Sequence, residues 1–328
     1  MHRVGDTWRP TASIAALRLR ALLYSRLRAW FAERGVLEVE TPILSAAGNT
    51  DPNICSFRAL YTGPADSGAA QRWLRTSPEY PLKRLLAAGV GDCYELGRVF
   101  RDGEAGRHHN PEFTMLEWYR VGRDHMALMD DVAEVVGAAL QLTGRTLRVE
   151  RTSYRELYRS SFGFDAFTAA TEELRRPLVD IAIESDGLTR DDWLDLLMTH
   201  RLQPDFGEDR LLFVYDYPTS QCALARLRGQ GGDTVAERFE AYLGAQELAN
   251  GYHELVDARE QRARFERDLA TRRLRGVDEP VLDENLLAAL ATGMPDCSGV
   301  ALGIERLLLA MSGATDIAEV LAFPFARA

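Results

Sequence analysis

Long apolar runs are missing from this sequence. No stretch approaches the ~20 consecutive apolar residues that a helix needs to cross a bilayer, and the opening "MHRVGDTWRPTAS" has no apolar centre of the signal-peptide type. Cysteine is scarce and never forms a Cys-x-x-Cys pair, which argues against a zinc site and fits reduced thiols in the cytoplasm. We therefore expect a cytoplasmic protein that does not enter a membrane. Its cysteines, which we expect to be small buried residues, are Cys55, Cys93, Cys222 and Cys297.

Two common nucleotide-binding loops are also missing. The sequence contains neither Gly-x-Gly-x-x-Gly nor a phosphate-binding loop that ends in Gly-Lys-Ser/Thr. The formal charge of −10 makes the chain a poor general binder of nucleic acids, because such binding depends on cations that neutralise phosphates. The composition, 46% hydrophobic and 27% charged over 328 residues, is that of a globular protein with a substantial core. We expect residues 1–328 to form a single domain.

The hydrophobic patterns predict a mixed α+β fold. The predicted strands are joined mainly by hairpins and the helices stand in blocks between them, which favours a largely antiparallel sheet. At 12–34, for example, Leu19, Leu23, Leu27 and Phe31 recur at four-residue spacing before Gly35, a residue suited to end a helix. Helices are predicted at 12–34, 81–89 with Pro78 suited to the first turn, 124–142, 190–200, 257–274, 283–292 and after 303. Strands are predicted at 36–44, with alternation until Pro42, at 72–80, ending in a turn, and at 92–101, 112–122, 210–218, on both sides of 244, and at 297–303.

The most charged hairpin is predicted between "DCYELGRVFR" and "EFTMLEWYRVG". Arg101 ends the first strand, where the sheet would hold it ready to grip a phosphate. Phe113 begins the return strand and could stack on a base, while Glu117 and Tyr119 lie two residues apart and so point to the same face. A carboxylate beside a phenol suits an ammonium ligand. A surface hairpin with solvated charges explains the segment equally well.

Two further segments carry candidate chemistry. Glu240, Glu247 and Glu254 recur every seven residues, but the intervening glycines break a helix, so we expect two strands on which the acids converge. Glu240 and Glu247 could then hold Mg²⁺, which favours one or two carboxylates together with nucleotide phosphates. In "GVALGIERLLL" a small-residue strand turns at Gly303 into an apolar helix that carries Arg306 in its first turn. Scattered surface carboxylates and a buried turn with one exposed arginine are the simpler alternatives.

Together these segments resemble the signature motifs of the class II aminoacyl-tRNA synthetases. "GVLEVETPIL" resembles the first motif, "FRDGEAGRHHNPEFTMLEWY" the second and "GVALGIERLLL" the third. Within the class, "TSPEYPLKRLL", "HNPEFTMLEWY" and "AERFEAYLGAQELANGYHEL" are similar to lysyl-tRNA synthetases. The resemblance implies a class II catalytic core, a mostly antiparallel sheet flanked by helices, and a homodimer formed through the first motif.

The first predicted helix begins at residue 12, which leaves no room for the N-terminal anticodon-binding barrel of a lysyl-tRNA synthetase. The sequence therefore resembles the lysyl-type ligases that modify elongation factor P. This resemblance implies activation of lysine, preferably (R)-β-lysine, with ATP and Mg²⁺, and transfer to a lysine of elongation factor P. Stable tRNA binding is not expected. Two alternatives are a stand-alone enzyme that charges tRNA or another carrier, and an inactive paralogue that serves as a regulatory or scaffold subunit.

The resemblance also implies roles for individual residues. Arg101 and Arg306 would be catalytic and bind the α- and γ-phosphates of ATP. Phe113 would stack on adenine, Glu79 would meet the amino group near the substrate carboxyl, and the ε-ammonium would lie against Glu117, Tyr119 and Glu254. The implied ATP set is Arg101, Asp102, Gly103, Glu104, His109, Asn110, Phe113, Glu247, Leu248, Gly303 and Arg306; the lysine set is Ser77, Pro78, Glu79, Glu117, Tyr119, Asn250, Glu254 and Ala301; the Mg²⁺ set is Glu240 and Glu247.

Two positions depart from the lysyl-type pattern. Gly103 stands where the family usually has the glutamate that helps to read adenine, and Glu104 follows it. Ala301 stands where lysyl-tRNA synthetases usually have glycine. The added methyl would crowd an α-amino group, whereas a β-amino acid carries its amine one carbon further on. A methyl-sized change is worth ~1–3 kcal/mol of discrimination, which predicts a preference for β-lysine.

Overall fold

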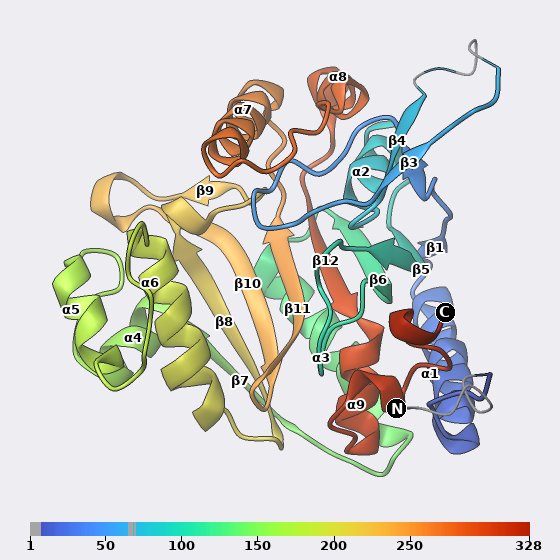
Figure 1. The fold of residues 1–328 in the computed structure, drawn as a ribbon, viewed down its shortest axis with the longest axis horizontal. Helices are drawn as coiled ribbons and strands as arrows, with labels where there is room; N and C mark the ends of the chain where they lie inside the picture. Colours follow the sequence, from blue (N-terminus) through green and yellow to red (C-terminus); the bar gives the residue numbers. More distant parts are fainter. Residues whose placement is uncertain (1–7, 65–67, 69) are drawn as a thin grey trace.

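The computed structural model describes residues 8–64, 68 and 70–328 (Figure 1). A nine-stranded sheet crosses the molecule in the order β1-β5-β6-β12-β11-β10-β8-β7, and β9 pairs with β10. Only β1–β5 and β7–β8 pair in parallel, so the predicted, largely antiparallel α+β sheet is confirmed. The strands are β1 Leu37–Glu38, β5 Cys93–Phe100, β6 Glu112–Val121, β7 Arg148–Ser153, β8 Arg210–Pro218, β9 Leu227–Arg228, β10 Val235–Leu243, β11 Gln246–His253 and β12 Cys297–Gly303.

The first predicted strand, 36–44, is wrong in its length. Only Leu37–Glu38 pairs in the large sheet, while β2 (Leu44–Ser45) joins β4 (Gln71–Leu74) and β3 (Arg58–Leu60) in a separate small sheet. Between them the chain crosses from one sheet to the other. Arg75 donates to the backbone carbonyl of Thr41, and the Thr41 hydroxyl donates to Glu95 at 2.7 Å. Side chains therefore fix this crossing, which alternation in the sequence does not reveal.

Helices α1 (Ile14–Glu33), α3 (His125–Gln141) and α9 (Ile304–Ser312) pack on the sheet around the main core. The Ser13 hydroxyl accepts a hydrogen bond from the Ala16 N–H at the start of α1, and Gly35 adopts a φ of 67° just after its end, as the sequence predicts. Phe31, which is fully buried, stacks on Tyr94 with ring centroids 4.1 Å apart. The apolar stripe of α1 thus anchors the helix to β5.

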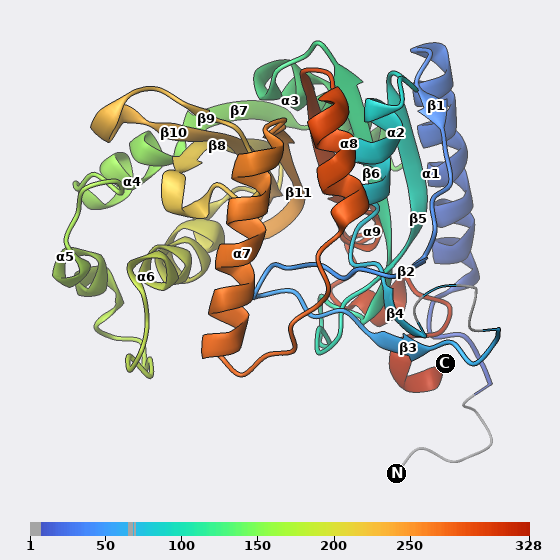
Figure 2. The ribbon, with the colours of Figure 1, turned by 90° about the horizontal axis from the view of Figure 1, so that it is seen from above.

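Helices α2 (Glu79–Ala87), α7 (Ala258–Leu274) and α8 (Glu284–Gly293) form a second group at one end of the strands, which Figure 2 shows from above. Their shared core includes Phe265 and Leu286 together with Cys93 and Cys297 of the sheet. The buried positions of these two cysteines confirm part of the prediction made for them; Cys55 and Cys222 are only half-buried. Helices α2 and α7 of this group cover one end of the cavity described below.

A third group of helices lies beside β7 and β8, where Figures 1 and 2 both place it. It comprises α4 (Tyr154–Phe162), α5 (Thr171–Arg175) and α6 (Arg190–Leu197), and only α6 had a clear signal in the sequence. These helices bury their own core against β8, including Tyr158, Trp193 and Leu197. Among the described residues, none belongs to a helix long and apolar enough to span a membrane.

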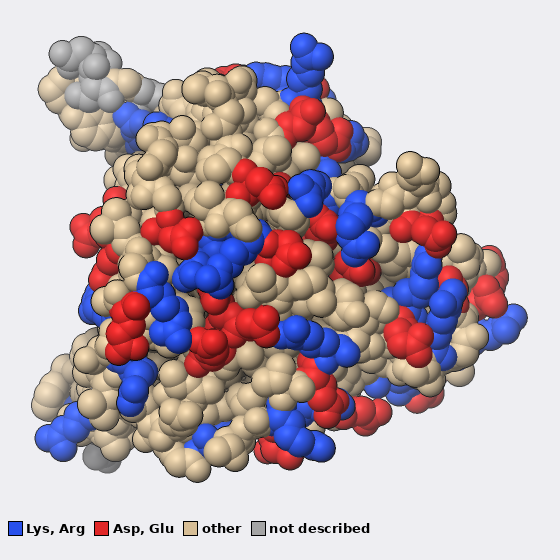
Figure 3. All heavy atoms as spheres, turned by 180° about the vertical axis from the view of Figure 1, so that it is seen from behind, with Lys and Arg blue, Asp and Glu red and all other residues tan. Residues whose placement is uncertain are grey.

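The face seen in Figure 3 carries acidic and basic side chains in alternation. The basic groups drawn there are arginines, because the one lysine of the sequence, Lys83, is only 1% exposed. The face drawn there therefore presents no continuous basic surface.

Candidate active site

One cavity of about 920 Å³ opens on the sheet and reaches from the loop after β5 to helices α2 and α7. The strand register determines which side chains face it. Glu117, Ala301, Asn250 and Glu240 are successive partners across β6, β12, β11 and β10, so they form one row on one face. A second row, two residues along, contains Tyr119, Gly299, Tyr252 and Arg238. Residues almost two hundred positions apart in the sequence are therefore neighbours here.

Most of the residues singled out from the sequence line this cavity. Pro78, Asp102 and Gly103 are not among those that do: Pro78 precedes α2, and the Asp102 N–H donates to the Cys55 carbonyl at 2.8 Å. Gly103 adopts a φ of 82°, which suits its residue type. The lining includes Ser77, Glu79, Arg101, Glu104, His109, Asn110, Phe113, Glu117, Tyr119, Glu240, Glu247, Leu248, Asn250, Glu254, Ala301, Gly303 and Arg306.

Carboxylates gather at the end of the cavity under α2. Glu117 is 2% exposed and accepts hydrogen bonds from the hydroxyls of Ser77 at 2.6 Å and Tyr119 at 2.9 Å. Burial, followed by the nearby charge of Glu79, raises the pKa of Glu117 to about 8. Such a carboxylate would be stabilised by a bound cation, because an ammonium partner favours the charged form.

Sequence reasoning missed the protein amine at this end. Lys83 of α2 lies 2.6 Å from a carboxylate oxygen of Glu79 and 2.6 Å from Oε2 of Glu254. Burial opposes the charge of Lys83, but the two carboxylates outweigh it and raise the pKa of the ammonium above its ordinary value. One carboxylate oxygen of Glu254, a residue predicted to line the cavity, is therefore already paired with the Lys83 ammonium. The available signal was that "SPEYPLKRLL" contains the only lysine of the sequence.

Arginines occupy the opposite end of the cavity. The Arg101 guanidinium lies 5.2 Å from the centre of the Phe113 ring and 3.6 Å from Glu104. Arg306 donates to the backbone carbonyl of Glu247 at 2.8 Å, and its other terminal nitrogen lies 2.9 Å from Nε2 of His109. Burial and then the charge of Arg306 lower the pKa of His109, which favours the neutral imidazole. Two arginines, an aromatic ring and a histidine of lowered pKa thus lie together where the nucleotide was predicted.

The loop between β5 and β6 is fixed by the last segment of the chain. The Ile317 N–H donates to the Arg107 carbonyl at 2.8 Å. The Asn110 side chain donates to the Glu112 carbonyl at 2.6 Å and accepts from the Phe325 N–H at 2.9 Å. Asn110 therefore holds the loop in place with both ends of its amide, a role that the sequence did not indicate.

Glu240 and Glu247 come together as predicted, on the two strands of a hairpin that turns at Gly244. A register shift after Ala241 pairs Tyr242 with Glu247, although Glu240 pairs with Asn250. Burial and then the charge of Glu240 raise the pKa of Glu247, so negative charge there lacks full compensation. This is the environment in which a divalent cation is stabilising.

The Glu240 carboxylate is held by three donors that sequence reasoning missed. Oε2 accepts from the hydroxyls of Tyr217, at 2.7 Å, and Tyr242, while Arg238 donates to Oε1. Oε1 retains capacity for another partner. The donor set therefore fits Mg²⁺, which prefers carboxylate oxygens beside nucleotide phosphates, with Glu247 as the less encumbered ligand.

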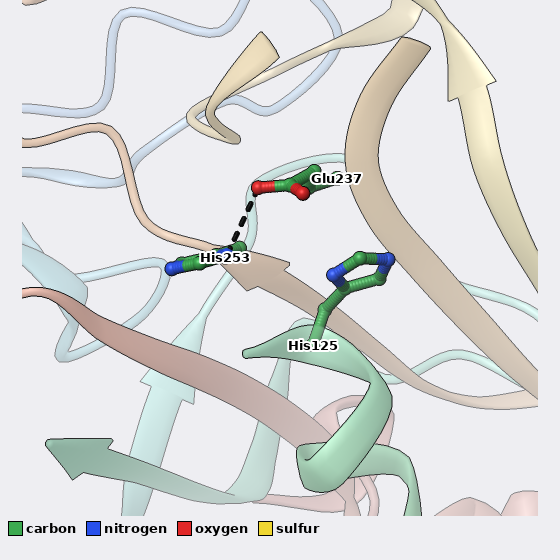
Figure 4. A group of neighbouring side chains, drawn as sticks. All are labelled: His125, Glu237 and His253. Carbon is green, nitrogen blue, oxygen red and sulfur yellow. Dashed lines mark ion pairs between the residues drawn. The ribbon is translucent and has the colours of Figure 1, made fainter. Parts of the chain in front are cut away.

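A different group of potential metal ligands, His125, Glu237 and His253, lies away from the cavity lining (Figure 4). His253 stands 2.9 Å from both Glu237 and Asp296; burial opposes its charge, but hydrogen bonds to these carboxylates raise the pKa of the imidazole. Glu237 also pairs with Arg226 and Arg228, each at 2.9 Å. Cations already balance Glu237, so we interpret this group as a buried ionic network.

Comparison with known proteins agrees with this geometry. A family model described as "tRNA synthetases class II (D, K and N)" matches residues 2–327. The proteins named Elongation factor P--(R)-beta-lysine ligase from Salmonella gallinarum and Yersinia enterocolitica are each 45% identical to this chain over 325 residues, which cover 98% of both chains in each comparison. This chain belongs to that ligase family of class II synthetases. The class II fold predicted from the three motifs is thereby confirmed.

The family motifs explain which residues of the site could be predicted from the sequence and which could not. The three motifs supply Arg101, Phe113 and Arg306, all of which lie on the cavity wall. Lys83, Arg238 and Tyr217 lie in or behind the same wall and were not predicted, because they act through other side chains. Their contacts with the predicted residues become visible only in the folded structure.

Proposed function

We propose that this chain activates (R)-β-lysine, or lysine, with ATP and transfers the acyl group to a lysine side chain of elongation factor P. The observation that carries this proposal is one cavity whose lining includes Arg101 and Arg306 together with the three glutamates Glu79, Glu117 and Glu254. A diamino acid placed between them would have its carboxylate toward ATP and its ammonium groups toward Glu79 and Glu117. The 45% identity to ligases of that name supports the same assignment.

The activation step would need no protein nucleophile. A substrate carboxylate oxygen attacks the α-phosphorus of ATP, an O–P bond forms, and the bond to pyrophosphate breaks. Arg101 would offset the charge that develops at the α-phosphate, and Arg306 would bind the γ-phosphate of the leaving group. Mg²⁺, held by Glu247 and Glu240 with the phosphates, would supply further charge neutralisation. The adenylate is then attacked by the deprotonated acceptor amine, and AMP leaves.

The cavity would also hold ATP and the amino acid in position for the reaction. Phe113 would receive the adenine ring, with His109 and Glu104 beside it, and the loop that carries them is held by the Asn110 amide. At the other end, Ser77 and Tyr119 fix the Glu117 carboxylate through two hydrogen bonds. Both reacting groups would therefore be held before reaction, which removes much of the entropic barrier.

The proposal includes a cytoplasmic homodimer. Apolar side chains of the first-motif region, Ile14, Leu22, Leu37, Ile43 and Leu44, are each more than 40% exposed. Monomers rarely expose such groups together, so a second copy would cover them. We propose that the acceptor is a protein and that stable tRNA binding is absent, since the net charge is −10 and acidic and basic groups alternate in Figure 3.

ATP–pyrophosphate exchange with α-lysine and (R)-β-lysine in parallel tests the activation step. Intact-mass analysis of purified elongation factor P then tests transfer. We expect faster exchange with (R)-β-lysine and a mass increase of one lysyl group on the factor. Absence of exchange with both amino acids would refute the enzyme assignment and favour an inactive paralogue. Exchange that charges tRNA and leaves the factor unmodified would identify a stand-alone synthetase instead.

A further inference from the structure

Lys83 has no role in the proposed reaction, yet it is the most buried cation at the substrate end of the cavity. It is 1% exposed, and Glu254, also 1% exposed, holds it at 2.6 Å. Lys83 itself does not line the cavity, whereas Glu79, Glu117 and Glu254 do. An ammonium group therefore stands behind the wall and touches two of the three carboxylates that face the substrate.

The second oxygen of Glu254, Oε1, lies on the side of Gly299, a residue of the cavity lining. Oε1 has no hydrogen-bond partner among the described residues, although the side chain is fully buried. It lies beside Gly299, where a Cβ would come within 2.6 Å of Oε1 and 2.2 Å of the Tyr119 ring. A side chain at position 299 would displace one of them, so the glycine keeps this oxygen available to a ligand.

The charges here can be counted. When bound ammonium groups keep the carboxylates ionised, the three carboxylates Glu79, Glu117 and Glu254 and the one ammonium, Lys83, leave two negative charges. Lysine and β-lysine each carry two ammonium groups. We propose that Lys83 determines substrate specificity as a resident cation: it neutralises one of three carboxylates, so that the pocket matches an amino acid with two ammonium groups. This inference rests on the proposed function for the identity of the substrate.

Among the residues that the structure describes, Glu79 and Glu254 are the two carboxylates within ion-pair distance of the Lys83 ammonium. Without Lys83, the remaining carboxylates would hold one more proton, which an incoming ammonium would have to displace. Without Glu254, the ammonium of Lys83 would compete with the substrate for Glu79. The ionisable groups concerned are Glu79 and Tyr80 of α2, Cys93 of β5, Glu117 and Tyr119 of β6, His253 of β11, Glu254 after it, and Cys297 of β12.

The test is a double-mutant cycle on ligand binding. Lys83→Met, Glu254→Gln and the double variant are compared with the wild type by calorimetric binding of (R)-β-lysine and α-lysine, from pH 6 to 9. We expect each single variant to bind at least about tenfold more weakly at pH 7, the equivalent of one pKa unit. The double variant should bind better than either single variant, because its charges balance again, although it lacks the Glu254 oxygen beside Gly299. Lys83→Arg, which keeps the charge, should bind better than Lys83→Met.

Controls separate charge from folding. Arg84→Met, on the exposed side of the same helix, should bind like the wild type. If Lys83→Met fails to fold, Glu254→Gln and the double variant still decide the question. Losses that add in the double variant, or an equal loss of ATP affinity, would overturn the inference. Binding without any ATP–pyrophosphate exchange in the wild type would instead count against the proposed function.

Discussion

The raised pKa of Glu117 makes the affinity for the amino acid depend on pH. An ammonium group binds the ionised carboxylate, whereas the empty site holds a proton below its pKa of about 8, mainly because the residue is buried. At pH 7 about one tenth of the empty sites would be ionised, so the apparent affinity would be about tenfold below its limiting value, or about 1.4 kcal/mol. One pH unit lower, the loss grows to about a hundredfold.

Direct binding of α-lysine or (R)-β-lysine, measured by calorimetry between pH 6 and 9, checks this expectation. Affinity should rise with pH up to about 8 and then level off, while each binding event at pH 7 releases close to one proton. The proton count follows from titrations in buffers of different ionisation enthalpy. Glu117→Gln is the matched control, since it keeps the shape of the side chain and cannot ionise; its weaker binding should lose the pH dependence centred near 8 and keep that of Glu254, whose pKa burial raises to about 7.

The raised pKa of Glu117 also makes the stability of the folded protein depend on pH. Because folding raises the pKa of Glu117, the folded protein binds more protons, and this group destabilises the empty fold as pH rises from its ordinary value toward 8. A bound diamino acid should relieve that loss. An affinity that stays constant from pH 6 to 8 in a folded, active enzyme would refute the reasoning.

Three further predictions concern the rest of the cavity. Arg101→Ala should slow pyrophosphate exchange by about 10²–10³-fold and leave the melting temperature nearly unchanged, since its guanidinium would act on the transition state; unchanged exchange would contradict its role. Glu247→Gln should raise the Mg²⁺ concentration needed for half-maximal exchange, measured by Mg²⁺ titration at fixed ATP, whereas an unaltered requirement would remove Glu247 from the metal site. Ala301→Gly should improve exchange with α-lysine relative to (R)-β-lysine by the equivalent of ~1–3 kcal/mol, and an unchanged ratio would show that the methyl group does not discriminate.

The fold was predictable because its main signals are local. The stripe of Leu23, Leu27 and Phe31 predicts α1, and Gly244 marks the turn of the β10–β11 hairpin. The strand predicted at 36–44 was too long, because the alternation of apolar and polar residues continues past Glu38, where the chain leaves the large sheet. The contacts that redirect it, Arg75 with Thr41 and Thr41 with Glu95, join segments more than thirty residues apart.

Of the site, the residues that belong to sequence motifs could be predicted. Arg101 and Arg306 follow from the resemblance, and the structure places both on the cavity wall. The register shift after Ala241, which brings Glu247 to the face of Glu240, leaves no mark in the sequence. Nor does the pairing of Lys83 with Glu254, because residues 171 positions apart carry no local pattern.

The burial of the only lysine has a practical consequence for following acyl transfer. Reagents directed at side-chain amines need an exposed, unprotonated nucleophile, and Lys83 is 1% exposed and held as an ion pair. A fluorescent succinimidyl ester should therefore not label a side chain of the folded enzyme. Acceptor proteins in the same tube could be labelled and counted without background from a side-chain amine of this chain.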